Sequence, residues 1–296
     1  MVEYRPKPVR PQIAAFALLC QVLWLSGCAT IDPLDRQVGT SELEKTVLAA
    51  GEFELVRVGR PMREPADERL DELVVYLGSD GRPWVDNRPA ADPTGRRSLA
   101  LELMIQDSRP AVYLGRPCYH GGADRSPCTA RLWTSGRYSD VVVDALETGL
   151  RELLARYRPG RLTLIGYSGG GTLAVLAASR MAAETDITVI TVAGNLDPAA
   201  WTAFHDLLPL SDSLDPVKAV PSPAGFRQLH LVGTEDARVP PRTIRRYRER
   251  HPDAQVLEVE GFDHVCCWVE EWRDILARIS ALQNRPSTGP PLPGDG

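Results

Sequence analysis

Lysine is scarce in this chain of 296 residues: only three of its 34 basic residues are lysines, namely Lys7, Lys45 and Lys218. None of them follows a glycine-rich loop, which excludes a Walker-type phosphate site and argues against a Schiff-base lysine. The formal net charge is -5 and no basic stripe is present, so nucleic acid is not an expected partner. The sequence also lacks zinc-site spacings and the HExxH motif, so we expect neither a metal nor an organic cofactor.

No membrane-spanning run is found at the N-terminus, where the apolar stretch 13–25 has only 13 residues. Three basic residues precede it, a pattern typical of a secretory signal. The stretch ends in LSGC, which resembles the lipobox of bacterial lipoproteins. The resemblance implies that residues 1–27 are removed and that lipid on Cys28 anchors the protein. Because Ala29 follows instead of aspartate, it also implies the outer membrane, facing the periplasm. The alternatives are an ordinary signal peptide or a buried helix with an incidental cysteine.

Four cysteines lie beyond the signal and lipobox, in a chain expected in an oxidising compartment. Cys118 and Cys128 flank a polar, turn-rich loop with little apolar content, which favours a disulfide between them. Cys266 and Cys267 are neighbours, and adjacent cysteines bond only with backbone strain. We therefore expect this second pair to be buried as free thiols, with a bond between them as the alternative.

Short apolar runs rich in β-branched residues alternate with helical patterns along the rest of the chain. The pattern predicts strands at 53–58, 73–77, 111–114, 162–165, 187–192, 229–232 and 255–259, and helices at 41–50, 96–105, 139–157, 170–183, 242–250 and 268–282. Such alternation predicts an α/β fold with a mostly parallel sheet and helices on both faces. We expect a single domain at 28–283, followed by a disordered proline- and glycine-rich tail at 284–296.

The strongest motif is RLTLIGYSGGGT at 161–172, where a buried strand runs through G-x-S-x-G into a helix. A serine on such a tight turn needs small neighbours, which Gly166 and Gly170 supply. The turn exposes the hydroxyl of Ser168 at the carboxyl end of the sheet, and the Gly169 N–H faces the position of an oxyanion. The alternatives are a dinucleotide-binding turn, which would need glycine in place of Ser168, and a glycine-rich turn without a nucleophile.

A serine nucleophile needs a base, and the base needs an acid that fixes its tautomer. After the strand 229–232 comes GTEDARVP, which holds Asp236, and after the last strand comes GFDH, which holds His264. Among the five histidines, only His264 has the expected loop and chain order. Asp236 is preferred as the acid over Glu235 and Asp197, because its spacing from the preceding glycine fits the motif.

Together GYSGG, GTEDARVP and GFDHVCCW are similar to the nucleophile elbow, acid loop and histidine loop of the α/β-hydrolase superfamily. The resemblance implies the α/β-hydrolase fold, with Ser168 as nucleophile, His264 as general base and then acid, and Asp236 as orienting carboxylate. It also implies two oxyanion donors: the N–H of Gly169 and, after the strand 111–114, the N–H of Arg116. There the usual His-Gly of the family is replaced by Leu-Gly.

These residues predict a serine hydrolase that cleaves a small-molecule carboxylic ester through an acyl-enzyme and is tethered to the membrane by its lipid. Two alternatives remain, a peptidase or amidase on the same fold and a non-catalytic envelope lipoprotein that binds a ligand. The connection 193–226, which carries Trp201 and several leucines, forms either a partial apolar lid or an ordinary packed helix and loop.

Overall fold

The computed structural model describes residues 33–39, 42–62 and 69–283. The predicted signal segment, the predicted anchor Cys28 and the predicted tail 284–296 lie outside them. The strands are β1 (Glu44–Ala50), β2 (Phe53–Gly59), β3 (Glu72–Leu77), β4 (Trp84–Val85), β5 (Arg88–Pro89), β6 (Ala111–Leu114), β7 (Arg161–Tyr167), β8 (Ile187–Val192), β9 (Arg227–Gly233) and β10 (Gln255–Val259). The α-helices are α2 (Pro33–Val38), α3 (Leu99–Gln106), α4 (Asp140–Tyr157), α5 (Gly169–Met181), α6 (Pro198–Phe204), α7 (Pro216–Ala219), α8 (Arg245–Arg250) and α9 (Trp272–Gln283), and short 3-10 helices lie at Ala130–Trp133 and Pro241–Ile244. In the part of the chain that is described, no helix is long and apolar enough to cross a membrane.

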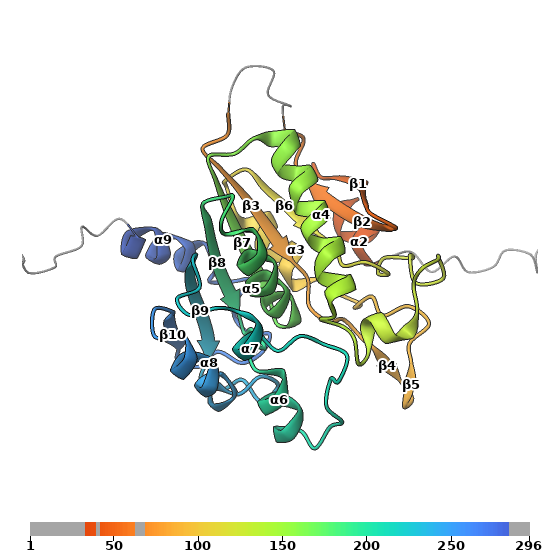
Figure 1. Ribbon diagram of the computed structural model, residues 1–296. Helices are drawn as coiled ribbons and strands as arrows, with labels where there is room; N and C mark the ends of the chain where they lie inside the picture. The colour runs from red at the N-terminus through yellow and green to blue at the C-terminus, as the bar shows by residue number, and fades with distance from the viewer. Residues whose placement is uncertain (1–32, 40–41, 63–68, 284–296) are drawn as a thin grey trace, which may run out of the picture. The chain divides into compact units, whose positions relative to one another are not determined.

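Eight strands form one sheet in the order β1-β2-β6-β3-β7-β8-β9-β10, and β4 and β5 form a separate hairpin. From β6 to β10 the strands are parallel, whereas β2 runs antiparallel to both of its neighbours. Because the strands are parallel, the carboxyl ends of β3, β7, β8 and β9 meet at one edge of the sheet (Figure 1). The predicted α/β architecture is confirmed, and this edge carries the site described below.

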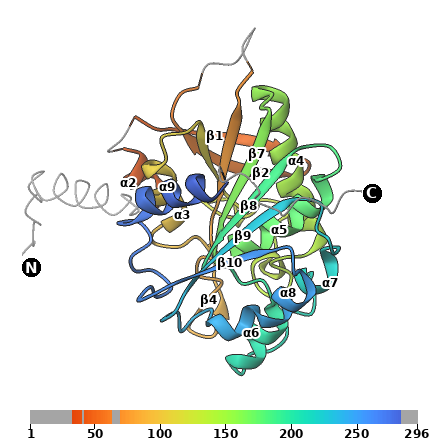
Figure 2. The same ribbon diagram turned by 90° about the vertical axis from the view of Figure 1, so that its left-hand side faces the viewer.

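Helices cover both faces of the sheet, and each face has its own apolar core. Successive side chains of a strand point to opposite faces, so Leu73, Val75 and Leu77 of β3 join the core under α4 and α5. Val74 and Tyr76 of the same strand join the core under α3 and α9. Figure 2 shows α4 and α5 on one side of the sheet and α3 and α9 on the other. Burial on both faces explains why these strands are continuous apolar runs.

All seven predicted strands are present, each within two residues of its expected bounds, but the helix expected at 41–50 is wrong. Residues 44–50 form β1, an edge strand paired with β2 along its whole length. The side chains of Leu48 and Ala50 are buried, while that of Val47 is 54% exposed. Glu, Lys and Ala favour helices locally, but pairing with β2 and burial at alternate positions outweigh that preference.

Both cysteine pairs are disulfide-bonded. The bond between Cys118 and Cys128, with the two Cα atoms 5.5 Å apart, closes the loop as the sequence predicts. The bond between Cys266 and Cys267 corrects the expectation of buried free thiols. Cys266 is exposed on the turn after His264, so the position offers no apolar surroundings in which a free thiol would be buried.

His230, in the middle of β9, is a buried titratable group outside the site. Its ring lies between the hydroxyl of Thr191, 2.9 Å from Nδ1, and the side-chain oxygen of Gln228, 3.1 Å from Nε2. Burial, with a smaller contribution from the charge of His251, lowers the pKa of His230 to about 3. Folding therefore keeps this imidazole neutral at pH values where the unfolded chain, with a pKa near 6.5, takes up a proton.

We expect the stability to fall as the pH drops from about 6.5 toward 3, with His230 contributing about 1.4 kcal/mol for each pH unit. Denaturant unfolding of the wild type and of His230→Gln at several pH values measures this. Between pH 6.5 and 3 the free energy of unfolding of the variant should vary less steeply with pH than that of the wild type, by about 1.4 kcal/mol per pH unit. Equal slopes for the two proteins would show that His230 is not the group that titrates.

Candidate active site

Ser168 lies on the turn between β7 and α5, at the carboxyl edge of the sheet. Its φ of +55° is in the left-handed region, a strained conformation for a side chain other than glycine. The close approach of the chain explains the flanking glycines, because a Cβ at Gly166 would collide with the carbonyl of Gly170. A Cβ at Gly170 would in turn collide with the carbonyl of Leu77 in β3. The sequence G-x-S-x-G is thus what allows the turn to pass between its neighbours.

Ser168, His264 and Asp236 form one hydrogen-bonded chain. The Ser168 Oγ lies 3.1 Å from His264 Nε2, and His264 Nδ1 lies 2.8 Å from Asp236 Oδ2. A carboxylate only accepts, so Nδ1 carries the proton and Nε2 is left to accept from the serine hydroxyl. The other carboxylate oxygen, Asp236 Oδ1, accepts the N–H groups of Arg238 and Val239, both at 2.8 Å. Three loops far apart in the sequence therefore bring together the residues expected to form a triad.

The two weaker candidates for the acid lie elsewhere. Asp197 is the N-cap of α6, accepting the N–H of Ala200 at 2.9 Å, and its carboxylate also pairs with Arg246. Glu235 is exposed, next to Asp236 but on the outside of the loop. Neither carboxylate contacts His264.

The sheet order corrects the expected place of Arg116. Arg116 follows β6, and β3 lies between β6 and β7, so the loop beside Ser168 is the one after β3 at 78–81. A Cβ on Gly169 would collide with the carboxylate of Asp80 in that loop. Arg116 does not line the pocket at Ser168. Its side chain is buried, 3% exposed, and donates to Asp80 and to the carbonyl of Arg137.

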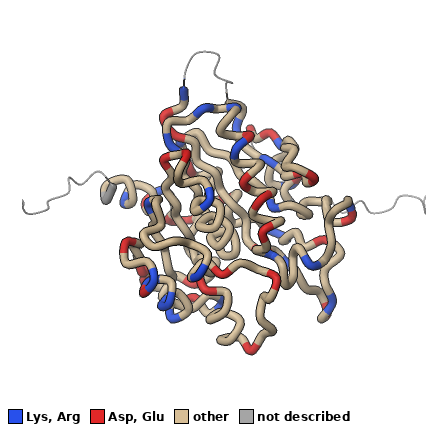
Figure 3. Tube along the Cα trace, viewed as in Figure 1, with Lys and Arg blue, Asp and Glu red and all other residues tan. Residues whose placement is uncertain are grey.

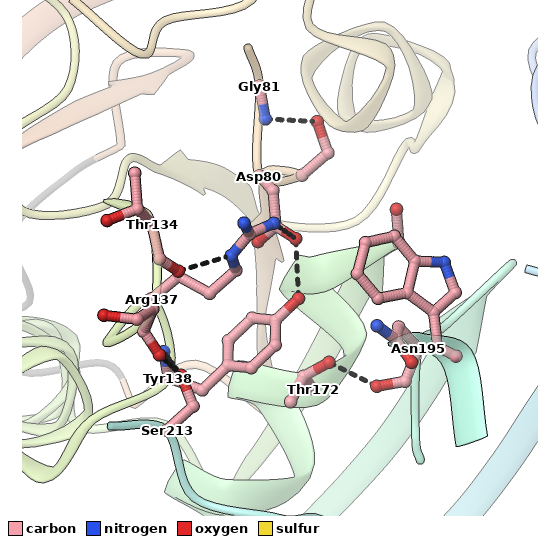
Figure 4. Close-up of polar contacts among 12 residues, drawn as sticks. Asp80, Gly81, Thr134, Arg137, Tyr138, Thr172, Asn195 and Ser213 are labelled. Atoms are coloured by element: carbon pink, nitrogen blue, oxygen red, sulfur yellow. Dashed lines mark hydrogen bonds and ion pairs between the residues drawn. The ribbon is translucent and has the colours of Figure 1, made fainter. Parts of the chain in front are cut away.

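Asp80, which was not predicted from the sequence as part of the site, is held by three donors. Oδ1 accepts from the guanidinium of Arg116. Oδ2 accepts from Arg137 Nη1 at 3.2 Å and from the Tyr138 hydroxyl at 2.6 Å (Figure 4). Burial alone would raise the pKa of Asp80, but the positive charges of Arg116 and Arg137 outweigh it and hold the pKa below its usual value. We call these four residues the Asp80 clamp. The signal in the sequence was the turn Gly78-Ser79-Asp80-Gly81, which follows a buried strand and holds a carboxylate.

A pocket of about 230 Å³ opens at Ser168. Its walls include Ser168, His264, Asp80, Arg137, Trp201 and Arg238. Trp201 comes from α6, and its indole N–H donates to the carbonyl of Arg238 at 2.7 Å. The Nε2 of His205, also from this segment, lies 2.8 Å from the same carbonyl. The connection 193–226 thus supplies one aromatic wall through a packed helix, while Leu207 and Leu208 are exposed instead of covering the site.

In residues 33–39, 42–62 and 69–283, no group of three or more His, Cys, Asp or Glu side chains is placed to hold a metal ion.

The sequence matches no protein-family model and no curated protein. Solved structures nevertheless superimpose on most of it. A membrane phospholipase A, described as a bacterial virulence factor, is 16% identical with a TM-score of 0.54, covering 93% of this chain and 98% of its own. The esterase Pf2001 of Pyrococcus furiosus is 12% identical with a TM-score of 0.55, covering 85% and 95%. The mouse α/β-hydrolase domain-containing protein 10 is 15% identical with a TM-score of 0.54, covering 81% and 98%. At such identities the likeness is one of fold.

Proposed function

We propose that this chain, which has the α/β-hydrolase fold, is a serine hydrolase that cleaves carboxylic esters through an acyl-enzyme. The observation that carries the proposal is the hydrogen-bonded chain from Ser168 through His264 to Asp236, open to a pocket at the serine. A binding protein has no need of a strained serine, a histidine and a buried carboxylate in this order. The non-catalytic alternative is therefore disfavoured.

In the proposed mechanism, the Ser168 Oγ attacks the ester carbonyl while His264 Nε2 takes its proton. Asp236 keeps the proton on Nδ1 and stabilises the imidazolium that forms. The Gly169 N–H, at the start of α5, donates to the oxyanion, and an N–H of the loop 78–81 is the second donor. The protonated His264 then gives its proton to the departing alcohol oxygen. Water, deprotonated by His264, attacks the acyl-enzyme, and the acid leaves with Ser168 restored.

The small pocket at Ser168, about 230 Å³, favours an acyl group of short or medium length. The names of two structures with the same fold, an esterase and a phospholipase A, favour an ester as the bond that is cleaved. An amide would demand more help for its leaving group, and a prolyl endopeptidase also has this fold, but this chain covers only 38% of it.

The test uses the protein comprising residues 29–296. Its rates of hydrolysis are measured for 4-nitrophenyl esters with two to twelve acyl carbons and compared with those for the matching 4-nitroanilides. We expect turnover of the esters with an optimum at a short acyl chain and much slower turnover of the anilides. Folded protein that cleaves the anilides but not the esters would make the chain an amidase. The absence of any turnover would restore the binding-protein alternative.

The place of this reaction in the bacterial envelope, with the chain tethered through Cys28, rests on the N-terminal sequence and stays a prediction.

A further inference from the structure

One positive charge at the pocket, that of Arg238, forms no ion pair with a residue that the structure describes. Arg238 lines the pocket with Ser168 and His264, and the residue is exposed. Its backbone is fixed, because its N–H donates to Asp236 and its carbonyl accepts from Trp201 and His205. Its guanidinium makes no hydrogen bond or ion pair with any residue that the structure describes. The backbone of Arg238 is thus held in place, while its guanidinium is available to bind a ligand.

The other charges of the pocket are already paired. The carboxylate of Asp80 is shared by Arg116, Arg137 and Tyr138. The carboxylate of Asp236 is taken by His264 and by backbone N–H groups. Asp263, beside His264, accepts the N–H groups of Val265 and Cys266 and forms no ion pair with Arg238. The guanidinium of Arg238 therefore stays available to a substrate. Its positive charge is a local feature, because the whole chain is acidic and Figure 3 shows both signs of charge interspersed along it.

The position of Arg238 also selects one side of the substrate. Its N–H donates to Asp236, the carboxylate behind His264, and its side chain lines the pocket beside His264. In keeping with this place, its positive charge favours a lower pKa of Asp263, the residue before His264. In the proposed mechanism the alcohol leaves on this side, because His264 must protonate it. The acyl group and the oxyanion lie on the other sides of the tetrahedral carbon.

From these observations we propose that the substrate is an ester whose alcohol portion carries an anionic group, such as a carboxylate or a phosphate, and that Arg238 binds this group. The inference rests on the proposed ester hydrolysis and adds the substrate class to it. Arginine suits the role because its planar guanidinium binds both oxygens of such an anion at once. Arg238 is then a specificity-determining residue that acts on the substrate and not on the triad.

The experiment compares two esters of equal shape, 3-carboxyphenyl butyrate and its neutral analogue 3-carbamoylphenyl butyrate. Wild-type protein should prefer the carboxylate ester about tenfold in kcat/KM. In Arg238→Gln this ratio should fall to about one, and in the wild type it should shrink as salt is added. The matched control is Arg242→Gln, because Arg242 lies outside the pocket with its guanidinium stacked on Phe204. This variant should keep the wild-type ratio.

The outcomes separate the inference from the function on which it rests. If neither ester is turned over by folded protein, the proposed function fails. If both are turned over without preference, or if Arg238→Gln keeps the preference, the anion subsite is refuted while the esterase stands. A preference for an anion on the acyl side alone, tested with the 4-nitrophenyl hemiester of glutaric acid against 4-nitrophenyl valerate, would also refute it.

Discussion

Replacing Ser168 with alanine is expected to lower ester turnover by about 10⁴-fold or more while the protein stays folded. The variant removes the atom that attacks the carbonyl and leaves the strained turn otherwise in place, so circular dichroism and the unfolding temperature should change little. The rate is measured with the best 4-nitrophenyl ester of the chain-length series. Labelling by a fluorophosphonate probe, which reacts with an activated serine, should disappear in the same variant.

Ser108→Ala is the matched control, since Ser108 is exposed and lines a different surface hollow. It should keep both the turnover and the labelling. If Ser168→Ala kept a substantial part of the turnover, or if the probe still labelled it, another nucleophile would have to carry the reaction.

Replacing Asp80 with asparagine is expected to have the second-largest effect, on both stability and rate. Two buried guanidiniums, those of Arg116 and Arg137, lose the carboxylate that compensates them, which should cost about 3 kcal/mol, or a Tm lower by about 6–10 °C. The loop 78–81, with the proposed second oxyanion donor, loses its anchor at the same time. We expect kcat to fall about 100-fold with KM changed little.

A positioning role is separated from simple unfolding by titrating active sites with the fluorophosphonate probe well below the Tm. A normal number of labelled active sites, each with a low kcat, supports a positioning role. A reduced number of labelled active sites, each with a normal kcat, would contradict it. Glu184→Gln is the control, because it removes the carboxylate from an exposed pair with Arg151 and should change neither Tm nor kcat measurably. Tyr138→Phe, which removes one hydrogen bond from the clamp, should give an intermediate result.

The pH dependence of the Asp80 contribution has a definite sign. Because the pKa of Asp80 is lowered in the folded protein, the stabilisation is complete above its unfolded value near 3.8 and is lost as the pH falls further. The asparagine variant lacks it at every pH. The difference in stability between the two proteins should therefore narrow only in strong acid, unlike the effect of His230, which begins near pH 6.5.

The sequence predicted the central strands well because each is short, apolar and buried on both faces. The strands β3 and β8, for example, contain no exposed residues, so their sequences lack the alternation of polar and apolar residues that is typical of an amphipathic helix. The edge strand β1 was missed for the opposite reason: it is half exposed, and its Glu, Lys and Ala residues look helical until β2 is placed beside it. The hairpin of β4 and β5 has two residues on each side, too few for periodicity to register.

In the site, chain order was sufficient to predict that Ser168, Asp236 and His264 lie together, because each follows a strand that ends at the same edge of the sheet. Chain order was not sufficient for Arg116. Whether the loop after β3 or that after β6 lies beside the serine depends on the order of the strands within the sheet, which the sequence does not state. The side chain of Arg116 reaches the site indirectly, through Asp80, and that contact joins segments 36 residues apart.

The loop closed by Cys118 and Cys128 has a consequence for how this protein could be altered. Arg116 before the disulfide and Arg137 after it both hold Asp80, so the two ends of the segment are fixed to the same carboxylate. Between the cysteines the chain makes a largely exposed excursion at 121–127. Because Arg116 and Arg137 hold the two ends of the segment, a longer or different sequence at 121–127 should not alter the geometry of the pocket. A foreign peptide could therefore be inserted there without disturbing the active site.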